Sequence, residues 1–269
     1  MEESTFSFFT INYFQNNLKC GNCVNMVVDK GYEKAAHLYD LFDNKNLDFF
    51  LKYGQETGVV LDIGAGTGRI AIFLAERGVK VVCIEPSPAM RREFLKKMKK
   101  SPKLASNITL IAGDAQTFQL TEIFEVAFLS GSFDHIPKTE RIKSFSNINH
   151  HLKLEGKLVF DIYIEGMKDS PLSPIDTVKA GDYEYKRFIG TRILPDNIID
   201  VLLIYETYKQ GELIEKIEQR SSAFTTTRTD IHQLLEETGF SIQNEYCDYQ
   251  FSPFKEGDQL LVIDAFKIK

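Results

Sequence analysis

The sequence lacks the features that mark several large classes of protein. No apolar run approaches the roughly 18 residues that a membrane-spanning helix needs, so we expect no membrane partner. The first residues, Met-Glu-Glu, are acidic where the n-region of a secretion signal is basic, which predicts a cytoplasmic protein. The net charge of −6 argues against a nucleic-acid partner, because such a surface needs clustered excess base.

Cysteine is also scarce, with four residues in 269. Cys20 and Cys23 form a CxxC pair, but no second pair of cysteines or histidines completes a zinc set, so we expect no metal site. The pair is interpreted as a turn that carries two thiols; half of an intermolecular site and a redox pair are the alternatives. This cysteine usage fits a reducing compartment.

The rest of the chain is organised around one glycine-rich stretch, Val59 to Gly68. Apolar residues that lead into three alternate glycines predict a buried strand and a tight turn. The residues from Arg69 to Arg77 then show helical spacing and end at Gly78, a residue typical of helix C-termini. Strand, turn and helix form the first half of a nucleotide-binding βαβ unit, in which glycines let the backbone approach a ligand.

The spacing of the glycines distinguishes between two classes of cofactor. A dinucleotide fingerprint reads GxGxxG and holds a pyrophosphate, whereas this turn reads GxGxG and follows Asp62 closely. A carboxylate at that place would repel a pyrophosphate but can hold an ammonium group. The pattern therefore favours a cofactor without phosphates over a nicotinamide dinucleotide.

This stretch resembles motif I of the class I methyltransferases that use S-adenosylmethionine (SAM) and release S-adenosylhomocysteine. The resemblance continues at Glu85-Pro86, where a carboxylate at the tip of the second strand can accept both ribose hydroxyls, and at Gly113-Asp114-Ala115. It implies that Asp114 and the Ala115 amide read the adenine edge. The cofactor-binding residues that we predict are Asp62, Gly64, Ala65, Gly66, Glu85, Pro86, Asp114, Ala115 and Ser130.

Residues near the acceptor come from two other segments. In the resembled family, leading helices cover the SAM site, and Tyr39 lies in such a segment, either in the pocket wall or as an ordinary buried tyrosine. Residues 130 to 135 follow the fourth strand, where we expect them to face the methyl group. His135 could take a proton from the acceptor and Asp134 could orient an ammonium; alternatively this loop only shapes the pocket, and His135 caps the next helix.

The remaining pattern completes a fold class. We expect helices over residues 32–42 and 46–53, and a helix from Thr139 to Leu152 with Thr139 as N-cap. Three strands with polar alternation follow, Tyr183–Ile189, Ile198–Gln210 and Glu212–Phe224, joined by a turn at Gln210-Gly211. Glu155 stands where the resembled family more usually has Pro or Gly.

The predicted fold is an α/β, Rossmann-like seven-stranded mixed sheet with the last strand antiparallel, plus a small antiparallel insert after strand five. We divide the chain into an N-terminal lid segment (1–30), a SAM-binding core (31–178), an insert over the acceptor pocket (179–226) and a core completion (227–269). The predicted function is methyl transfer from SAM to a small-molecule acceptor, with nitrogen or oxygen as the nucleophile, by a monomer or homodimer. The alternatives are a SAM-binding regulatory or subunit protein without transfer activity and, less favoured, a nicotinamide-dependent oxidoreductase.

Overall fold

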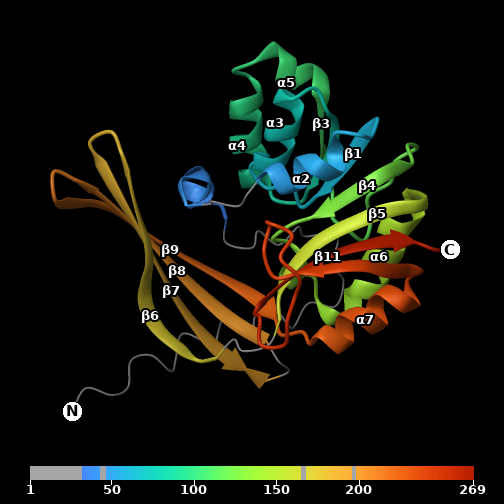
Figure 1. The fold of residues 1–269 in the computed structure, drawn as a ribbon. Coiled ribbons are helices and arrows are strands. Elements are labelled where there is room, and N and C mark those ends of the chain that lie inside the picture. Colours follow the sequence, from blue (N-terminus) through green and yellow to red (C-terminus); the bar gives the residue numbers. More distant parts are fainter. Residues whose placement is uncertain (1–31, 43–46, 165–167, 196–197) are drawn as a thin grey trace, which may run out of the picture.

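The computed structural model describes residues 32–42, 47–164, 168–195 and 198–269. Its larger part is a seven-stranded sheet in the order β10-β11-β5-β4-β1-β2-β3 (Figure 1). Strand β11 runs antiparallel to both of its neighbours, while β1 to β5 pair in parallel. The strands are β1 (Val59–Ile63), β2 (Lys80–Glu85), β3 (Ile108–Ala112), β4 (Phe124–Leu129), β5 (Leu152–Tyr163), β10 (Phe240–Tyr246) and β11 (Leu260–Lys267).

Helices cover both faces of this sheet, since alternate residues of each buried strand point to opposite faces. Val60 of β1 packs with one group of helices, whereas Leu61 and Ile63 pack with the other. The first group is α2 (Leu47–Gly54), α3 (Arg69–Glu76), α4 (Pro88–Met98) and α5 (Pro102–Asn107); the second is α6 (Lys138–His150) and α7 (Arg228–Glu237). The predicted seven-stranded sheet with one reversed strand is thereby confirmed.

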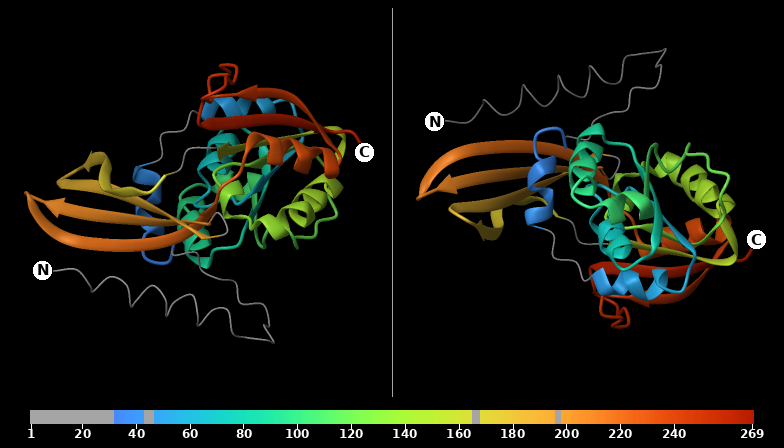
Figure 2. Two further views of the ribbon diagram at one scale, coloured as in Figure 1. Left: turned by 90° about the horizontal axis from the view of Figure 1, so that it is seen from below. Right: turned by 90° about the horizontal axis from the view of Figure 1, so that it is seen from above.

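A separate four-stranded antiparallel sheet follows β5, and it extends away from the larger sheet (Figures 1 and 2). The sequence predicted three of its strands, which are β7 (Tyr183–Leu194), β8 (Ile198–Lys209) and β9 (Glu212–Phe224). It missed β6 (Ser170–Ala180), which contains Pro171 and Pro174. Proline cannot donate to a strand ladder, and β6 tolerates both prolines because it lies at the edge of the sheet.

Two local predictions differ from the structure. Helix α6 begins at Lys138 after Pro137 and has no side-chain cap, so the prediction of Thr139 as N-cap is wrong. Proline suits a helix start because its missing N–H would have no partner there. The predicted helix over residues 32–42 is the 3-10 helix η1 (Ala36–Leu41).

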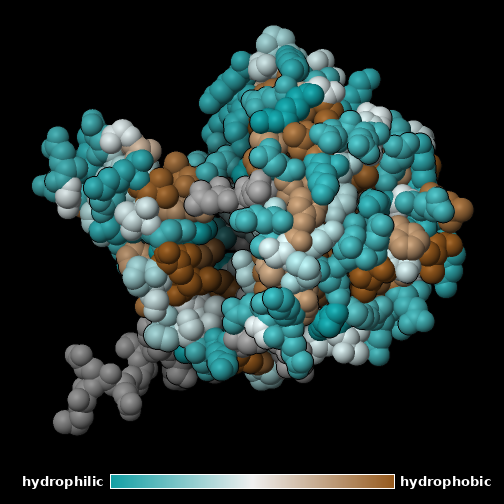
Figure 3. Space-filling view, in the orientation of Figure 1, coloured by the Kyte–Doolittle hydropathy of each residue, from teal (hydrophilic) through white to brown (hydrophobic). Residues whose placement is uncertain are grey.

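Helix η1 connects the two sheets. Leu38 packs with Tyr205 and Ile217 of the four-stranded sheet, while Ala36 packs on Ala89 and Met90 at the start of α4. One short helix is therefore held from both sides. Figure 3 shows a hollow between the four-stranded sheet and the rest of the protein, with apolar residues gathered on the sheet beside it.

The predictions about residues 1–30, including a lid and the Cys20–Cys23 pair, lie outside the described residues. Among the helices that the structure does describe, none is both long and apolar enough to cross a membrane.

Candidate functional site

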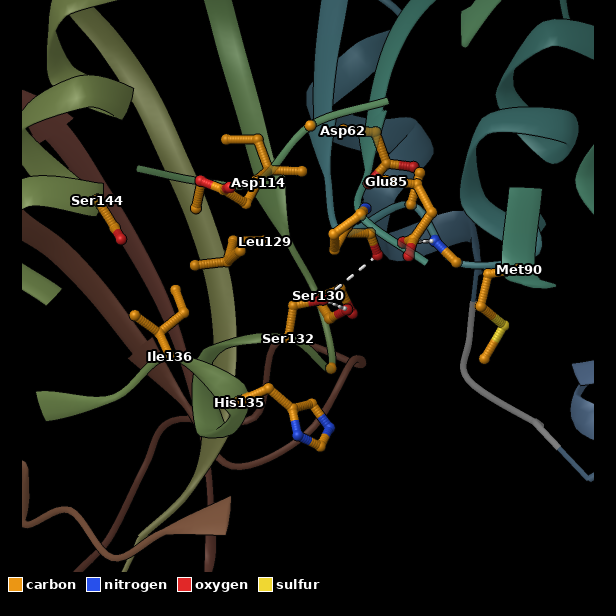
Figure 4. Close-up of a pocket in the computed structure, with 18 of the residues that line it drawn as sticks. Asp62, Glu85, Met90, Asp114, Leu129, Ser130, Ser132, His135, Ile136 and Ser144 are labelled. Carbon is orange, nitrogen blue, oxygen red and sulfur yellow. Dashed lines mark hydrogen bonds between the residues drawn. The ribbon is translucent and has the colours of Figure 1, made fainter. Parts of the chain in front are cut away.

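A cavity of about 380 Å³ opens at the carboxyl ends of β1, β2 and β4. Every site residue predicted from the sequence lines it except Asp134. Figure 4 shows Asp62, Glu85 and Asp114 at one end of the cavity and His135 at the other. The size lies within the range typical of cofactor pockets, roughly 300–1,000 Å³.

In the turn after β1, glycine is needed at Gly64 and at Gly66 for different physical reasons. Gly66 has φ +59°, and a Cβ added there would meet nothing within 4 Å, so its missing side chain leaves room on the cavity wall. Gly64 has φ +70°, and a Cβ there would lie 2.2 Å from the hydroxyl oxygen of Ser132. Both glycines line the cavity, but only Gly66 leaves open space where a side chain would lie, whereas Gly64 is required by the packing of the protein itself.

Glu85 ends β2, and its side chain is 5% exposed. One carboxylate oxygen accepts a hydrogen bond from the Gly66 amide and the other from the Ser87 amide, both at 2.7 Å. These bonds hold the carboxylate against the glycine turn. Since each carboxylate oxygen has two lone pairs, Glu85 retains the capacity to accept ligand hydroxyls.

Asp114 shapes the turn after β3. Its Oδ1 accepts from the amides of Gln116 and Thr117 and from the Thr117 hydroxyl, at 2.9–3.0 Å. These three donors use the same oxygen, so Oδ2 can accept from a ligand at the cavity. The Ala115 carbonyl accepts from Asn147 of α6, which fixes the next residue of the turn.

His135 lies in the 3-10 helix η2 (Phe133–His135), where three segments of the chain meet. Its Nδ1 is 3.3 Å from the carbonyl oxygen of Ser222 in β9, and its Nε2 is 3.1 Å from the Tyr32 hydroxyl. A carbonyl can only accept, so Nδ1 carries a proton, and in the neutral imidazole Nε2 accepts from Tyr32. Tyr39 packs edge-on against Tyr32 with ring centroids 6.3 Å apart, so both aromatic rings belong to this end of the cavity.

Asp134 does not line the cavity, although it precedes His135 in η2. Its charge acts on the Arg141 guanidinium of α6. Burial lowers the pKa of Arg141, the charges of Asp134 and Asp230 offset part of this effect, and the resulting pKa is about 10. The two neighbours differ because successive residues of a 3-10 helix point in directions about a third of a turn apart. We therefore withdraw Asp134 as a residue that orients the acceptor.

The sequence did not predict the residues that support the cavity lining by hydrogen bonds without lining the cavity themselves. Asp161 of β5 is 5% exposed and accepts from the Ser130 hydroxyl, the Gly131 amide and the Tyr249 hydroxyl. Asp40 of η1 accepts from the Thr67 hydroxyl in the glycine turn and from Lys97 of α4. No local pattern marks these residues, because their partners are far away in the sequence.

The charges that line the cavity are mostly negative. Asp62, Glu85, Asp114 and Glu140 contribute four carboxylates, and Arg69 contributes the one guanidinium in the described lining. A cleft with an excess of one sign attracts a ligand of the opposite sign. The lining therefore favours a cationic ligand over a pyrophosphate.

Comparison with known proteins agrees with this arrangement. Residues 60–156, from β1 to the start of β5, match the family model described as a methyltransferase domain. The chain is a class I SAM-dependent methyltransferase. The putative methyltransferase YqeM of Bacillus subtilis is 24% identical over 258 residues, which cover 88% of this methyltransferase and 98% of YqeM.

Two solved structures share the fold of this methyltransferase. The CcbJ methyltransferase from Streptomyces caelestis has a TM-score of 0.74 at 16% identity, and the match covers 91% of this chain and 100% of that one. SAM-bound CalS10, an amino pentose methyltransferase from Micromonospora echinaspora, has a TM-score of 0.64 at 17% identity, covering 99% of this chain and 100% of that one.

The residues of the cavity fit SAM, which is the cofactor of this methyltransferase. The molecule carries a sulfonium and an ammonium, which suit a lining with four carboxylates, and a single carboxylate, which suits Arg69. Its lack of phosphates agrees with Asp62 and Glu85 beside the glycine turn, since both carboxylates would repel a pyrophosphate.

Proposed function

We propose that this methyltransferase transfers the methyl group of SAM to a nitrogen or oxygen atom of a small-molecule acceptor. The observation that carries the proposal is the end of the cavity formed by Tyr32, Tyr39 and His135. Two aromatic rings and an imidazole offer an apolar wall with one proton acceptor, which suits a small organic molecule. CalS10, whose fold is similar, is an amino pentose methyltransferase, and this analogy supports the proposal.

We propose roles for the residues at the other end of the cavity. Glu85 accepts the ribose hydroxyls, Asp114 and the Ala115 amide bind the adenine edge, and the turn at Gly64 to Gly66 lies against the amino-acid part, with Asp62 and Ser130 nearby. Ala65 and Pro86 line the wall between these groups. Bound SAM supplies a methyl group already activated on a sulfonium, so the chain needs no residue that activates it.

The task of the chain is then to place the acceptor and to exclude water. A hydroxyl or ammonium nucleophile must also lose a proton. His135 suits this step because its Nδ1–H donates to Ser222, which leaves Nε2 as the proton acceptor at the cavity. Tyr32 donates to Nε2 in this structure, and we propose that the acceptor replaces that bond.

We also propose that the four-stranded sheet is an insert over the acceptor pocket and that it begins with β6. Its contact with η2 through Ser222 supports this division, because the sheet then reaches the residue nearest to the acceptor. The remaining chain on either side of the insert is the SAM-binding core.

The proposal is tested by a screen for S-adenosylhomocysteine release. Purified protein is incubated with SAM and with separate panels of small amines, amino sugars, small hydroxyl compounds, DNA, RNA and unfolded protein. We expect release with a small amine or hydroxyl compound and none with the three polymers. Release that depends on a polymer and occurs with no small molecule would contradict the proposed acceptor class.

A further inference from the structure

Asp161 lies one layer behind the wall of the cavity. It is near the carboxyl end of β5, pairs with Val262 of β11, and does not itself line the cavity. Ser130 and Gly131, which follow the neighbouring strand β4, do line it. Any effect of Asp161 that is transmitted by hydrogen bonds therefore reaches a ligand through these two residues.

Three donors converge on the Asp161 carboxylate. The Gly131 amide donates to Oδ1 at 2.7 Å, and Oδ2 accepts from the Ser130 hydroxyl at 2.5 Å and from the Tyr249 hydroxyl at 2.8 Å. The carboxylate thereby fixes both the backbone and the side chain of the loop after β4. Such a preorganised loop requires less reorganisation when a ligand binds.

The direction of these bonds decides what the loop offers to the cavity. The Ser130 hydroxyl donates to Asp161 and also interacts with the Tyr249 hydroxyl, so toward the cavity this oxygen can present only a lone pair. The Gly131 N–H is likewise directed at Asp161. The loop is thus set to accept hydrogen bonds from a ligand rather than to donate them.

Tyr249, from the segment between β10 and β11, holds the carboxylate in place. The centroid of its ring lies 5.6 Å from the ring centroid of Phe49 and 5.8 Å from that of Phe50, and both phenylalanines are in α2. Burial raises the pKa of the Tyr249 hydroxyl and the Asp161 charge raises it further, so the hydroxyl keeps its proton and donates. Aromatic packing of α2 with this segment therefore keeps a donor on Asp161.

We propose that Asp161 and Tyr249 are positioning residues, which set Ser130 as a hydrogen-bond acceptor for the ammonium group of SAM. The inference rests on the proposed cofactor site. In Figure 4, Ser130 lies between the Glu85 end of the cavity and His135, where the part of SAM beyond the ribose would lie. Asp161 acts through Ser130, since it makes the serine oxygen an acceptor and orients it.

The test compares two ligands that differ in the amino-acid part, which bears the ammonium group, and in the charge on sulfur. SAM has the amino-acid part on a sulfonium, whereas 5′-deoxy-5′-methylthioadenosine is a neutral thioether that keeps the adenosine but lacks the amino-acid part. Asp161→Asn places an amide donor at this position and frees the Ser130 hydroxyl to turn. We expect the Kd for SAM to rise about tenfold, which corresponds to the loss of one charge-assisted hydrogen bond. The Kd for the second ligand should change less than about twofold. Tyr249→Phe should give the same selective effect at about threefold, since one donor is lost and the ring packing remains.

Asp264→Asn is the matched control. Asp264 is equally buried, at 2% exposure, lies on the adjoining strand β11, and accepts from Tyr53, Lys157 and Asn244. It does not line the cavity. This variant should lower the melting temperature but leave the Kd of both ligands unchanged.

A double-mutant cycle connects Asp161 to Ser130. If Asp161 acts through Ser130, the losses of SAM affinity in Ser130→Ala and Asp161→Asn should not add in the double variant. Equal losses for both ligands in Asp161→Asn and Tyr249→Phe, or additive losses in the cycle, would overturn this inference alone. Wild-type protein that binds neither ligand would overturn the proposed cofactor site and the inference with it.

Discussion

The Nδ1 atom of His135 lies 3.3 Å from the carbonyl oxygen of Ser222. Eighty-seven residues separate the two in the sequence, and the contact joins the four-stranded sheet to the loop after β4. The carbonyl fixes the tautomer of the imidazole and thereby directs the basic Nε2 toward the cavity. The contact thus brings the four-stranded sheet, none of whose described residues lines the cavity, within hydrogen-bond distance of a residue that does.

Replacing His135 tests its role as a proton acceptor. In His135→Asn the amide nitrogen takes the place of Nδ1 and can still donate to Ser222, but nothing replaces Nε2. We expect methyl transfer to a protonated acceptor to fall by roughly 10²- to 10⁴-fold, with SAM affinity changed less than about twofold. Steady-state rates across a pH series measure the loss. A rate within about tenfold of the wild type, with the same pH dependence, would mean that His135 only shapes the pocket.

Two alanine variants separate the roles of the glycines. Gly66→Ala places a Cβ in the open space on the cavity wall, whereas Gly64→Ala drives one against Ser132. Both strain a positive φ, at a cost of about 1–2 kcal/mol. We expect Gly66→Ala to weaken SAM binding at least about tenfold and Gly64→Ala to lose clearly more stability, as measured by calorimetric titration and by urea unfolding. Equal stability and equal SAM affinity in the two variants would contradict this division.

Glu155 is expected to be a point of backbone strain. It has φ +62°, a conformation that L residues other than glycine rarely adopt. Glycine, one of the two residues more usual here in the resembled family, adopts this conformation without strain. Glu155→Gly should raise the free energy of unfolding by about 0.5–1 kcal/mol, since relief of the left-handed conformation exceeds the entropy that glycine loses. Lys153→Gly, two residues earlier and without a positive φ, should lower it; a loss of stability in both variants would refute the account.

Glu245 should make stability depend on pH in the acid range. Burial raises its pKa, but hydrogen bonds and charges from Arg228 and His232 outweigh this, and the pKa lies below its ordinary value of 4.5. A lowered folded-state pKa stabilises the protein above about pH 4.5 and the effect is lost as the pH falls. Glu245→Gln should therefore cost about 1 kcal/mol at pH 7 and much less at pH 3.

Thermal unfolding at the two pH values measures this difference. Glu184→Gln is the control, because Glu184 pairs with Lys186 on the surface of the four-stranded sheet and its loss should change little at either pH. An equal loss for Glu245→Gln at pH 7 and at pH 3 would show that the ion pairs contribute nothing.

The parts of the site that the sequence predicted are those with a local pattern. The turn from Gly64 to Gly66, Glu85 at a strand end and Asp114 in the next loop each have a recognisable neighbourhood, and all of them line the cavity. The reversed strand β11 was predicted from the resemblance to the class I methyltransferases, whose sheet has an antiparallel last strand.

The parts that it missed depend on contacts distant in sequence. Nothing near Asp161 indicates that Tyr249 will donate to it, and nothing near Tyr32 indicates that its hydroxyl will reach His135. Strand β6 was missed for the opposite reason, because its two prolines indicate a loop until an edge position is known. Asp134 was included because it neighbours His135 in sequence, but helical geometry separates the two side chains.

The central claim is that the glycine turn and Glu85 form a SAM site, and isothermal titration tests it most directly. Purified protein is titrated with SAM, S-adenosylhomocysteine and NADH, and the series is repeated with Glu85→Ala. We expect binding of both sulfur ligands at micromolar concentration, none of NADH, and at least about a tenfold loss in the variant, which removes the carboxylate that we propose as acceptor of the ribose hydroxyls. Binding of NADH, or failure of the wild-type protein to bind either sulfur ligand, would contradict the account.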